Sequence, residues 1–136
     1  MRHLYFILLL FSFFYSIVFE ACKREPYSPD YNEANGYVIG KENCDTDDTK
    51  DYWLIDFSYN QNTPQYGDTL ILNGITYTNV VKTKDLNQGL KLIGLRVVID
   101  FKTITSTEIE TIGCNVTNPI TYKLKELFII NQGEIR

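Results

Sequence analysis

The chain has 136 residues, enough for one domain, and 44% of them are hydrophobic, which is ordinary for a folded protein. Intrinsic disorder of the whole chain is therefore disfavoured. The formal net charge is -4, and no basic run follows the first segment of the chain. Nucleic-acid binding depends on clustered Lys and Arg, so we expect no nucleic acid among the partners.

The first segment has the features of a signal peptide. Arg2 and His3 form a short basic start, and residues 4–19 are almost entirely apolar. A membrane-spanning helix needs about 20 apolar residues, whereas this run is shorter and ends at Glu20. We therefore predict a signal peptide over residues 1–21, with an uncleaved N-terminal anchor as the alternative.

The sequence Phe19-Glu20-Ala21-Cys22 resembles a bacterial lipobox, in which a small residue precedes a cysteine that becomes acylated. The resemblance implies a mature protein that begins with lipidated Cys22; the alternative is an incidental thiol. A lipoprotein of this kind carries several acyl chains, and each buried CH₂ contributes about 0.8 kcal/mol to membrane binding. The expected location is the cell envelope, in the outer membrane, with the domain on its periplasmic or its surface face.

After Cys22 the sequence predicts a flexible tether over residues 22–34 and a single β domain over residues 35–136. Pro26, Pro29 and the neighbouring charged residues keep such a tether extended and unfolded. Acylation of Cys22 leaves Cys44 and Cys114 as an even pair in an oxidising compartment, so we expect a disulfide between them. The alternative is two buried free thiols.

No metal or other cofactor is expected. Neither Cys44 nor Cys114 lies in a CxxC spacing, and the only histidine, His3, belongs to the signal peptide. The acidic run over residues 45–51 has carboxylates suited to calcium, but it lacks the glycine and the terminal Glu of an EF-hand loop. We favour a solvated loop between strands over a calcium site.

The remaining sequence reads as short strands separated by turns. Trp53, Ile55, Phe57 and Tyr59 alternate with Asp56 and Ser58, which is the period of a strand with one buried face. Asn73-Gly74 predicts a type I′ hairpin, because both positions tolerate positive φ. Residues 85–92 are a weak helical candidate. The predicted strands cover residues 37–40, 52–59, 68–72, 75–81, 94–105, 108–112, 120–124 and 127–130, the last being apolar on both faces.

These elements indicate an all-β fold. Short strands with turn signals between them are typical of a small antiparallel barrel of the OB-like kind, with an Ig-like sandwich as the alternative. The lipobox-like start, the segment 36–40 ahead of Cys44, the hairpin region over residues 67–82 and the late Cys114 together resemble small lipoproteins from Bacteroidetes-type bacteria. That resemblance implies a lipid-anchored, OB-like domain and implies no activity.

Aromatic residues are the strongest candidates for ligand contacts. Exposed tyrosine rings stack on sugars or peptides, and OB-like barrels present such rings on one face. The candidates are Tyr52, Tyr66, Tyr77 and Tyr122. Tyr66 is expected to be the most exposed because it lies in a polar loop, whereas Trp53 and Phe57 are expected in the core.

Catalytic residues are not indicated. Without His3 the chain has no histidine for a general base or a catalytic triad, although a carboxylate pair could still act as acid and base. We expect a binding or interaction module that contacts a glycan, a peptide or an envelope protein. The alternatives are a purely structural envelope lipoprotein or subunit of a larger complex, and, third, an enzyme that uses a carboxylate pair.

Overall fold

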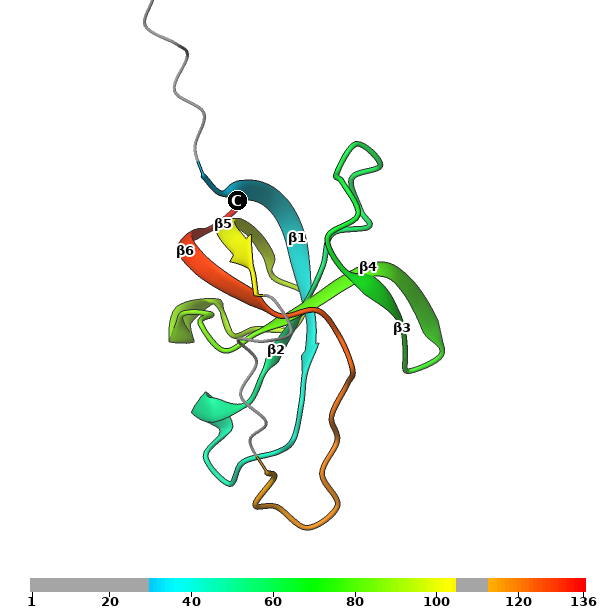
Figure 1. Cartoon of the computed structure of the whole chain (residues 1–136), viewed down its shortest axis with the longest axis vertical. Helices are drawn as coiled ribbons and strands as arrows, with labels where there is room; N and C mark the ends of the chain where they lie inside the picture. The colour runs from blue at the N-terminus through cyan, green and yellow to red at the C-terminus, as the bar shows by residue number, and fades with distance from the viewer. Residues whose placement is uncertain (1–29, 105–112) are drawn as a thin grey trace, which may run out of the picture. The chain divides into compact units, whose positions relative to one another are not determined.

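The computed structural model describes residues 30–104 and 113–136 (Figure 1). The predicted signal peptide, Cys22, most of the predicted tether and the strand expected over residues 108–112 lie outside the described residues. Within the described part, no helix is long and apolar enough to cross a membrane.

Six strands form one antiparallel sheet, which confirms the prediction of an all-β fold (Figure 1). The order across the sheet is β3-β4-β2-β1-β5-β6. Two 3-10 turns, η1 (Asp48–Lys50) and η2 (Gln88–Leu90), are the helical elements of the described chain, so the weak helical candidate over residues 85–92 is a single turn. The strands are β1 (Asn32–Lys41), β2 (Trp53–Asp56), β3 (Asp68–Leu72), β4 (Ile75–Thr83), β5 (Arg96–Thr103) and β6 (Leu127–Glu134).

The first strand begins at Asn32, three residues before the boundary expected at Asn35. Its early part pairs with β5, from Asn32 opposite Phe101 to Tyr37 opposite Arg96, and Ala34 is buried. Polar residues stand on both sides of Ala34, so this part of the sequence resembles a tether. Pairing with a strand about 60 residues away converts it into the central strand of the sheet.

The hairpin between β3 and β4 has the predicted turn. Asn73 has φ 52° and Gly74 has φ 80°, so both central positions are in the left-handed region, as a type I′ turn requires. Leu72 lies opposite Ile75, and Leu70 lies opposite Tyr77. Leu70, Leu72 and Tyr77 are half-buried on one face of the hairpin, whereas Ile75 is 56% exposed.

Two predictions for the last part of the chain are wrong. Residues 120–124 form no strand; Ile120 makes one isolated bridge to Asn43, because this segment crosses the sheet instead of joining its edge. In β6, Leu127 and Ile129 are buried, but Phe128 and Ile130 are 54% and 45% exposed. The sequence suggested burial of both faces, whereas β6 is the outermost strand and only one of its faces meets the core.

The sheet does not close into a barrel. One isolated parallel bridge links opposite sides of the strand order. It joins Lys82, at the end of β4, to Glu126, just before β6. The Lys82 backbone N–H donates to the Lys125 carbonyl at 2.9 Å. The arrangement is consistent with both expected forms, the OB-like barrel and the Ig-like sandwich.

The core confirms two sequence predictions and corrects one. Trp53 and Phe57 are buried as expected, and the Phe57 ring stacks on Phe101 with centroids 5.7 Å apart. Tyr66 was expected to be exposed, but its ring is half-buried and packs edge-on against Phe57 and Phe101, 6.0 and 4.9 Å away. The loop that carries Tyr66 is polar, yet it folds so that this ring packs against the main core.

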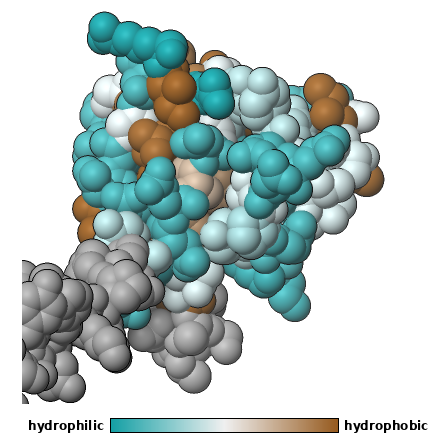
Figure 2. Space-filling model, turned by 90° about the horizontal axis from the view of Figure 1, so that it is seen from above, coloured by the Kyte–Doolittle hydropathy of each residue, from teal (hydrophilic) through white to brown (hydrophobic). Residues whose placement is uncertain are grey.

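Strand β2 is buried on both sides. Trp53 and Ile55 belong to the main core, whereas Leu54 packs with Val80 and Leu124 in a second cluster. Segment 120–125 therefore covers the outer side of the sheet at this point. Other hydrophobic residues remain outside: on the face shown in Figure 2 they lie in separate patches among hydrophilic ones.

Candidate ligand-binding pocket

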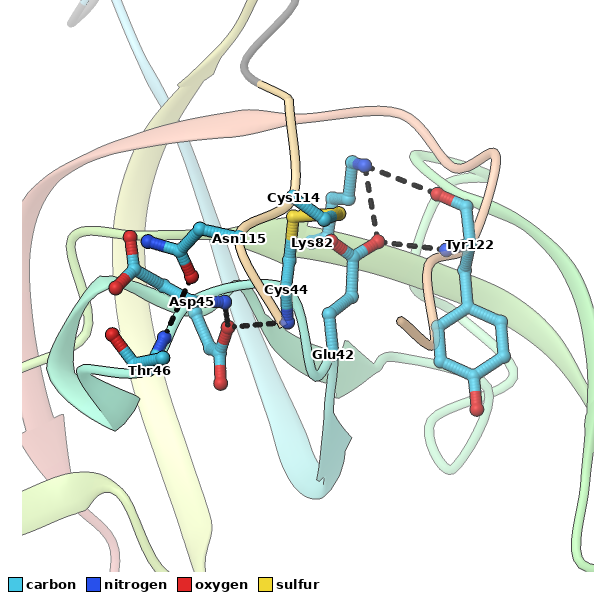
Figure 3. The surroundings of a disulfide bond; sticks show 9 residues. Glu42, Cys44, Asp45, Thr46, Lys82, Cys114, Asn115 and Tyr122 are labelled. Atoms are coloured by element: carbon cyan, nitrogen blue, oxygen red, sulfur yellow. Dashed lines mark hydrogen bonds and ion pairs between the residues drawn. A yellow bond between two sulfur atoms is a disulfide. The ribbon is translucent and has the colours of Figure 1, made fainter. Parts of the chain in front are cut away.

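The predicted disulfide between Cys44 and Cys114 is present and joins the loop after β1 to the segment that precedes β6 (Figure 3). Neighbouring hydrogen bonds reinforce the connection. The Asn115 backbone N–H donates to the Cys44 carbonyl at 2.9 Å, and the Thr46 N–H donates to the Asn115 side-chain oxygen at 2.9 Å. Two segments 70 residues apart in sequence are thus held side by side.

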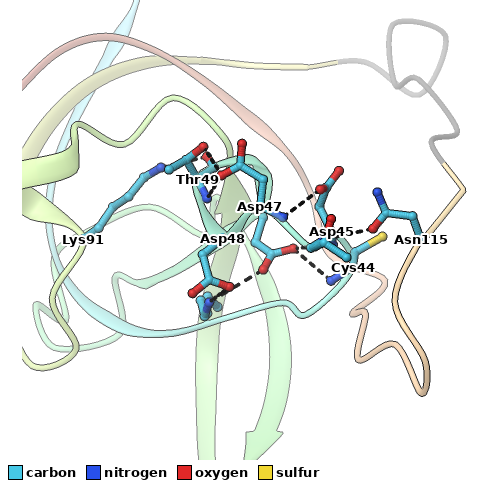
Figure 4. Close-up of polar contacts among 10 residues, drawn as sticks. Cys44, Asp45, Asp47, Asp48, Thr49, Lys91 and Asn115 are labelled. Atoms are coloured by element: carbon cyan, nitrogen blue, oxygen red, sulfur yellow. Dashed lines mark hydrogen bonds and ion pairs between the residues drawn. The ribbon is translucent and has the colours of Figure 1, made fainter.

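The acidic loop over residues 45–51 uses its carboxylates to fix its own shape (Figure 4). Asp51 accepts hydrogen bonds from the backbone N–H groups of Cys44 and Asp45 at 2.8 and 2.9 Å. The Thr49 side chain lowers the pKa of Asp47, and the Asp47 backbone N–H lowers the pKa of Asp45. Among the described residues, no three or more His, Cys, Asp or Glu converge on a point that could hold a metal ion.

A buried ion pair fixes segment 120–125 to the sheet (Figure 3). Glu42 is 2% exposed, and its Oε1 accepts from Lys82 Nζ at 3.1 Å and from the Tyr122 backbone N–H at 2.8 Å. Lys82 Nζ also donates to the Tyr122 carbonyl at 3.0 Å. Because removal of one member of such a pair leaves an uncompensated buried charge, we treat these three residues as a structural unit.

Above this unit lies a pocket of about 710 Å³, which we call the lysine–tyrosine pocket. Its walls come from the loop after β1, the end of β4 and segment 113–123. Two tyrosine rings and four lysines line it, against two carboxylates, of which Glu42 is already paired with Lys82. The pocket therefore carries excess positive charge beside aromatic surface. The residues are Tyr52, Tyr122, Lys50, Lys82, Lys84, Lys123, Glu42 and Asp45.

The Tyr52 ring contacts two of the lysines that line the pocket. The Nζ atoms of Lys82 and Lys84 lie 4.5 and 4.6 Å from the centroid of its ring, which is a cation–π distance. Burial raises the pKa of the Tyr52 hydroxyl, and the nearby carboxylate of Glu126 raises it further. Among the described residues, neither Lys84 nor Lys123 has a carboxylate within ion-pair distance.

The structure separates the four tyrosines that the sequence nominated. Tyr52 and Tyr122 line the same pocket, Tyr77 lines a different groove, and Tyr66 packs on the core. None of the pocket lysines was predicted from the sequence. Lys82 lies near the end of β4 and Lys84 just after it, and both approach the Tyr52 ring. The disulfide and the Glu42 ion pair join the segments that carry Lys50 and Lys123 to this part of the sheet.

Both carboxylates of the pocket already make contacts within the described chain. Glu42 is committed to Lys82 and Tyr122, and Asp45 accepts from the Asp47 backbone N–H at 2.9 Å. A carboxylate pair acting as acid and base would have to break these contacts. Ammonium groups and aromatic faces remain for a ligand.

Comparison with known proteins adds no relative: no family model, curated protein or solved structure matches the chain.

Proposed function

We propose that the chain is a lipoprotein of the bacterial envelope, held in the outer membrane by acylated Cys22, and that its β domain binds an anionic ligand in the lysine–tyrosine pocket. The observation that carries the proposal is the convergence of Lys82 and Lys84 on the Tyr52 ring inside a 710 Å³ pocket. The ligand has carboxylates next to a flat face. An acidic oligosaccharide and an acidic peptide both offer this chemistry.

The arrangement suits such a ligand because its two parts have separate roles. Lys84 and Lys123 supply charge with no carboxylate of the described chain to satisfy them, and they attract and orient an anion. Tyr122 supplies amphipathic surface for stacking, and the Tyr52 ring holds the ammonium groups of Lys82 and Lys84 beside it. The ion pair of Glu42 and Lys82 holds the walls together, so little ordering is required on binding.

Calorimetric titration of the mature, detergent-solubilised protein tests the proposal. The probes are a uronic-acid oligosaccharide, a neutral oligosaccharide of the same length and a Glu-rich peptide. We expect an acidic probe to bind with salt-sensitive affinity, and Lys84→Gln or Lys123→Gln to weaken it about fivefold, the equivalent of about 1 kcal/mol.

Lys125→Gln is the matched control. Lys125 is exposed on the same segment as Lys123, but it does not line the pocket. Equal loss of affinity in Lys125→Gln would show non-specific attraction and contradict the assigned pocket. The absence of binding by all three probes would contradict the binding function and favour a purely structural envelope protein.

The anchor is tested separately with Cys22→Ala. In detergent phase partitioning, the unmodified protein should enter the detergent phase, and the variant should be released into the soluble fraction or stall unprocessed. If the variant remains in the detergent phase at mature size, Cys22 is not the anchor.

A further inference from the structure

A second groove, which shares no residue with the lysine–tyrosine pocket, has a volume of about 490 Å³. It lies where β1, the end of β2, the β3–β4 hairpin and the loop before β5 meet. Three tyrosines line it: Tyr37, Tyr59 and Tyr77. We call it the tyrosine groove.

The most accessible ring in this groove is also held in place. Tyr59 is 63% exposed, yet its ring makes an edge contact with Tyr37 at 5.2 Å, and the Arg96 guanidinium carbon lies 5.5 Å from its centroid. Tyr37 and Arg96 are register partners on β1 and β5, so the sheet itself fixes both neighbours. An exposed ring that is already ordered loses little side-chain entropy when a ligand stacks on it.

The Asp56 carboxylate that lines the groove is buried and already hydrogen-bonded. Both Asp56 oxygens are used locally: Oδ1 accepts from the Ser58 N–H at 3.2 Å, and Oδ2 accepts from the Ser58 hydroxyl at 2.7 Å. Arg96 Nε is buried and has no hydrogen-bond partner in the described chain. Ile75 and Ile93 form exposed apolar rims at 56% and 64%.

We propose that the tyrosine groove is a carbohydrate-binding site for a neutral sugar. The apolar C–H face of a pyranose ring stacks on Tyr59, and its hydroxyls meet the phenol groups of the three tyrosines. Aromatic faces with polar edges match the amphipathic surface of a sugar, and the groove has no carboxylate cluster for a cationic ligand.

An extended peptide finds no partner in β1 at the groove, because Tyr37 is already paired on both sides, with Asp56 of β2 and Arg96 of β5. Residues 75–77 of β4 pair with β3 alone, so a peptide that adds there as a strand is a further outcome that would overturn the proposal. A proline-rich peptide, which binds to tyrosine-lined grooves without backbone pairing, remains as an alternative outcome of the test.

The test uses the mature, detergent-solubilised protein and soluble neutral oligosaccharides of glucose, mannose, galactose and xylose, with a proline-rich peptide alongside. Binding is followed by calorimetry at low and high salt. We expect at least one oligosaccharide to bind independently of salt, and Tyr59→Ala to weaken it about tenfold or more. Tyr59→Phe should keep most of the affinity because the ring remains.

Tyr31→Ala is the matched control, since Tyr31 is exposed but does not line the groove. Circular dichroism confirms that each variant is folded. Binding of none of the sugars, equal affinity in Tyr59→Ala, or Tyr59-dependent binding of the peptide alone would overturn the proposal. Lys84→Gln should leave sugar binding unchanged, so this proposal and that for the lysine–tyrosine pocket can fail separately.

Discussion

Replacement of Gly36 by Ala should destabilise the domain by about 2 kcal/mol. Gly36 lies in β1 opposite Val97, where a Cβ would stand 2.7 Å from Phe57 Cδ1 and 2.8 Å from both the Asp56 carbonyl oxygen and Ile55 Cγ2. Two of these atoms belong to fully buried side chains and the third is backbone, so the strand has to move. Overpacking of this kind costs about 1–3 kcal/mol, less the roughly 0.5 kcal/mol by which alanine restricts the unfolded chain.

Gly133→Ala is the matched comparison. Gly133 lies in β6 opposite Val98, on the other side of β5, and a Cβ there meets only Val98 Cγ1 at 3.6 Å, an ordinary contact. The same chemical change should therefore be neutral or stabilising by up to about 1 kcal/mol.

The assay is thermal and urea unfolding of the oxidised protein, followed by circular dichroism and by the fluorescence of buried Trp53. At about 4–8 °C per kcal/mol for a domain of this size, Gly36→Ala should lower Tm by roughly 10 °C, and Gly133→Ala should leave it unchanged or raise it by a few degrees. If Gly36→Ala is as stable as Gly133→Ala, the close packing of β1 against β2 is not as described.

Three further predictions concern the disulfide, the hairpin and the half-buried phenol of Tyr52. Joint replacement of Cys44 and Cys114 by Ser should lower the free energy of unfolding by about 4 kcal/mol, measured by urea titration; an unchanged midpoint would mean that the bond does not restrict the unfolded chain. Gly74→Val should cost about 1 kcal/mol or more because φ there is +80°, whereas Gly89→Val, in open space and without positive φ, should cost much less in the same titration. The raised pKa of Tyr52 contributes stability that is fully present below about pH 10 and is lost as the pH rises towards the folded pKa. Ultraviolet titration should show one tyrosine ionising late, and the absence of that step in Tyr52→Phe would assign it.

Local patterns predicted the parts of the fold that depend on nearby residues. The Asn73-Gly74 turn and the burial of Trp53 and Phe57 were readable because turn chemistry and the period of two act within a few residues. The period failed at the end of the predicted strand: β2 ends at Asp56, and Tyr59, expected on the buried face, is 63% exposed. The disulfide was predictable because cysteines are few and the predicted compartment is oxidising.

Features set by distant packing were not readable. Residues 120–124 alternate like a strand, but the Glu42 contact and the Cys114 bond hold them across the sheet. Tyr66 belongs to a polar loop, and its burial depends on where that loop folds. Two residues of the lysine–tyrosine pocket, Tyr52 and Tyr122, were predicted as ligand contacts because the chain is rich in tyrosine. The lysines were not predicted, because the three segments that carry them meet only in the tertiary structure.

The placement of β1 has a consequence for how the domain acquires its structure. β1 comes first among the strands, yet its partners include β5, about 60 residues later, and β6 must still pair with β5. Such distant pairing makes folding slow, on the scale of milliseconds to seconds, because long loops must close before contacts form. The β3–β4 hairpin can form early, but β1 keeps an unpaired edge until β5 arrives, so this strand is the one most exposed to aggregation while the chain folds.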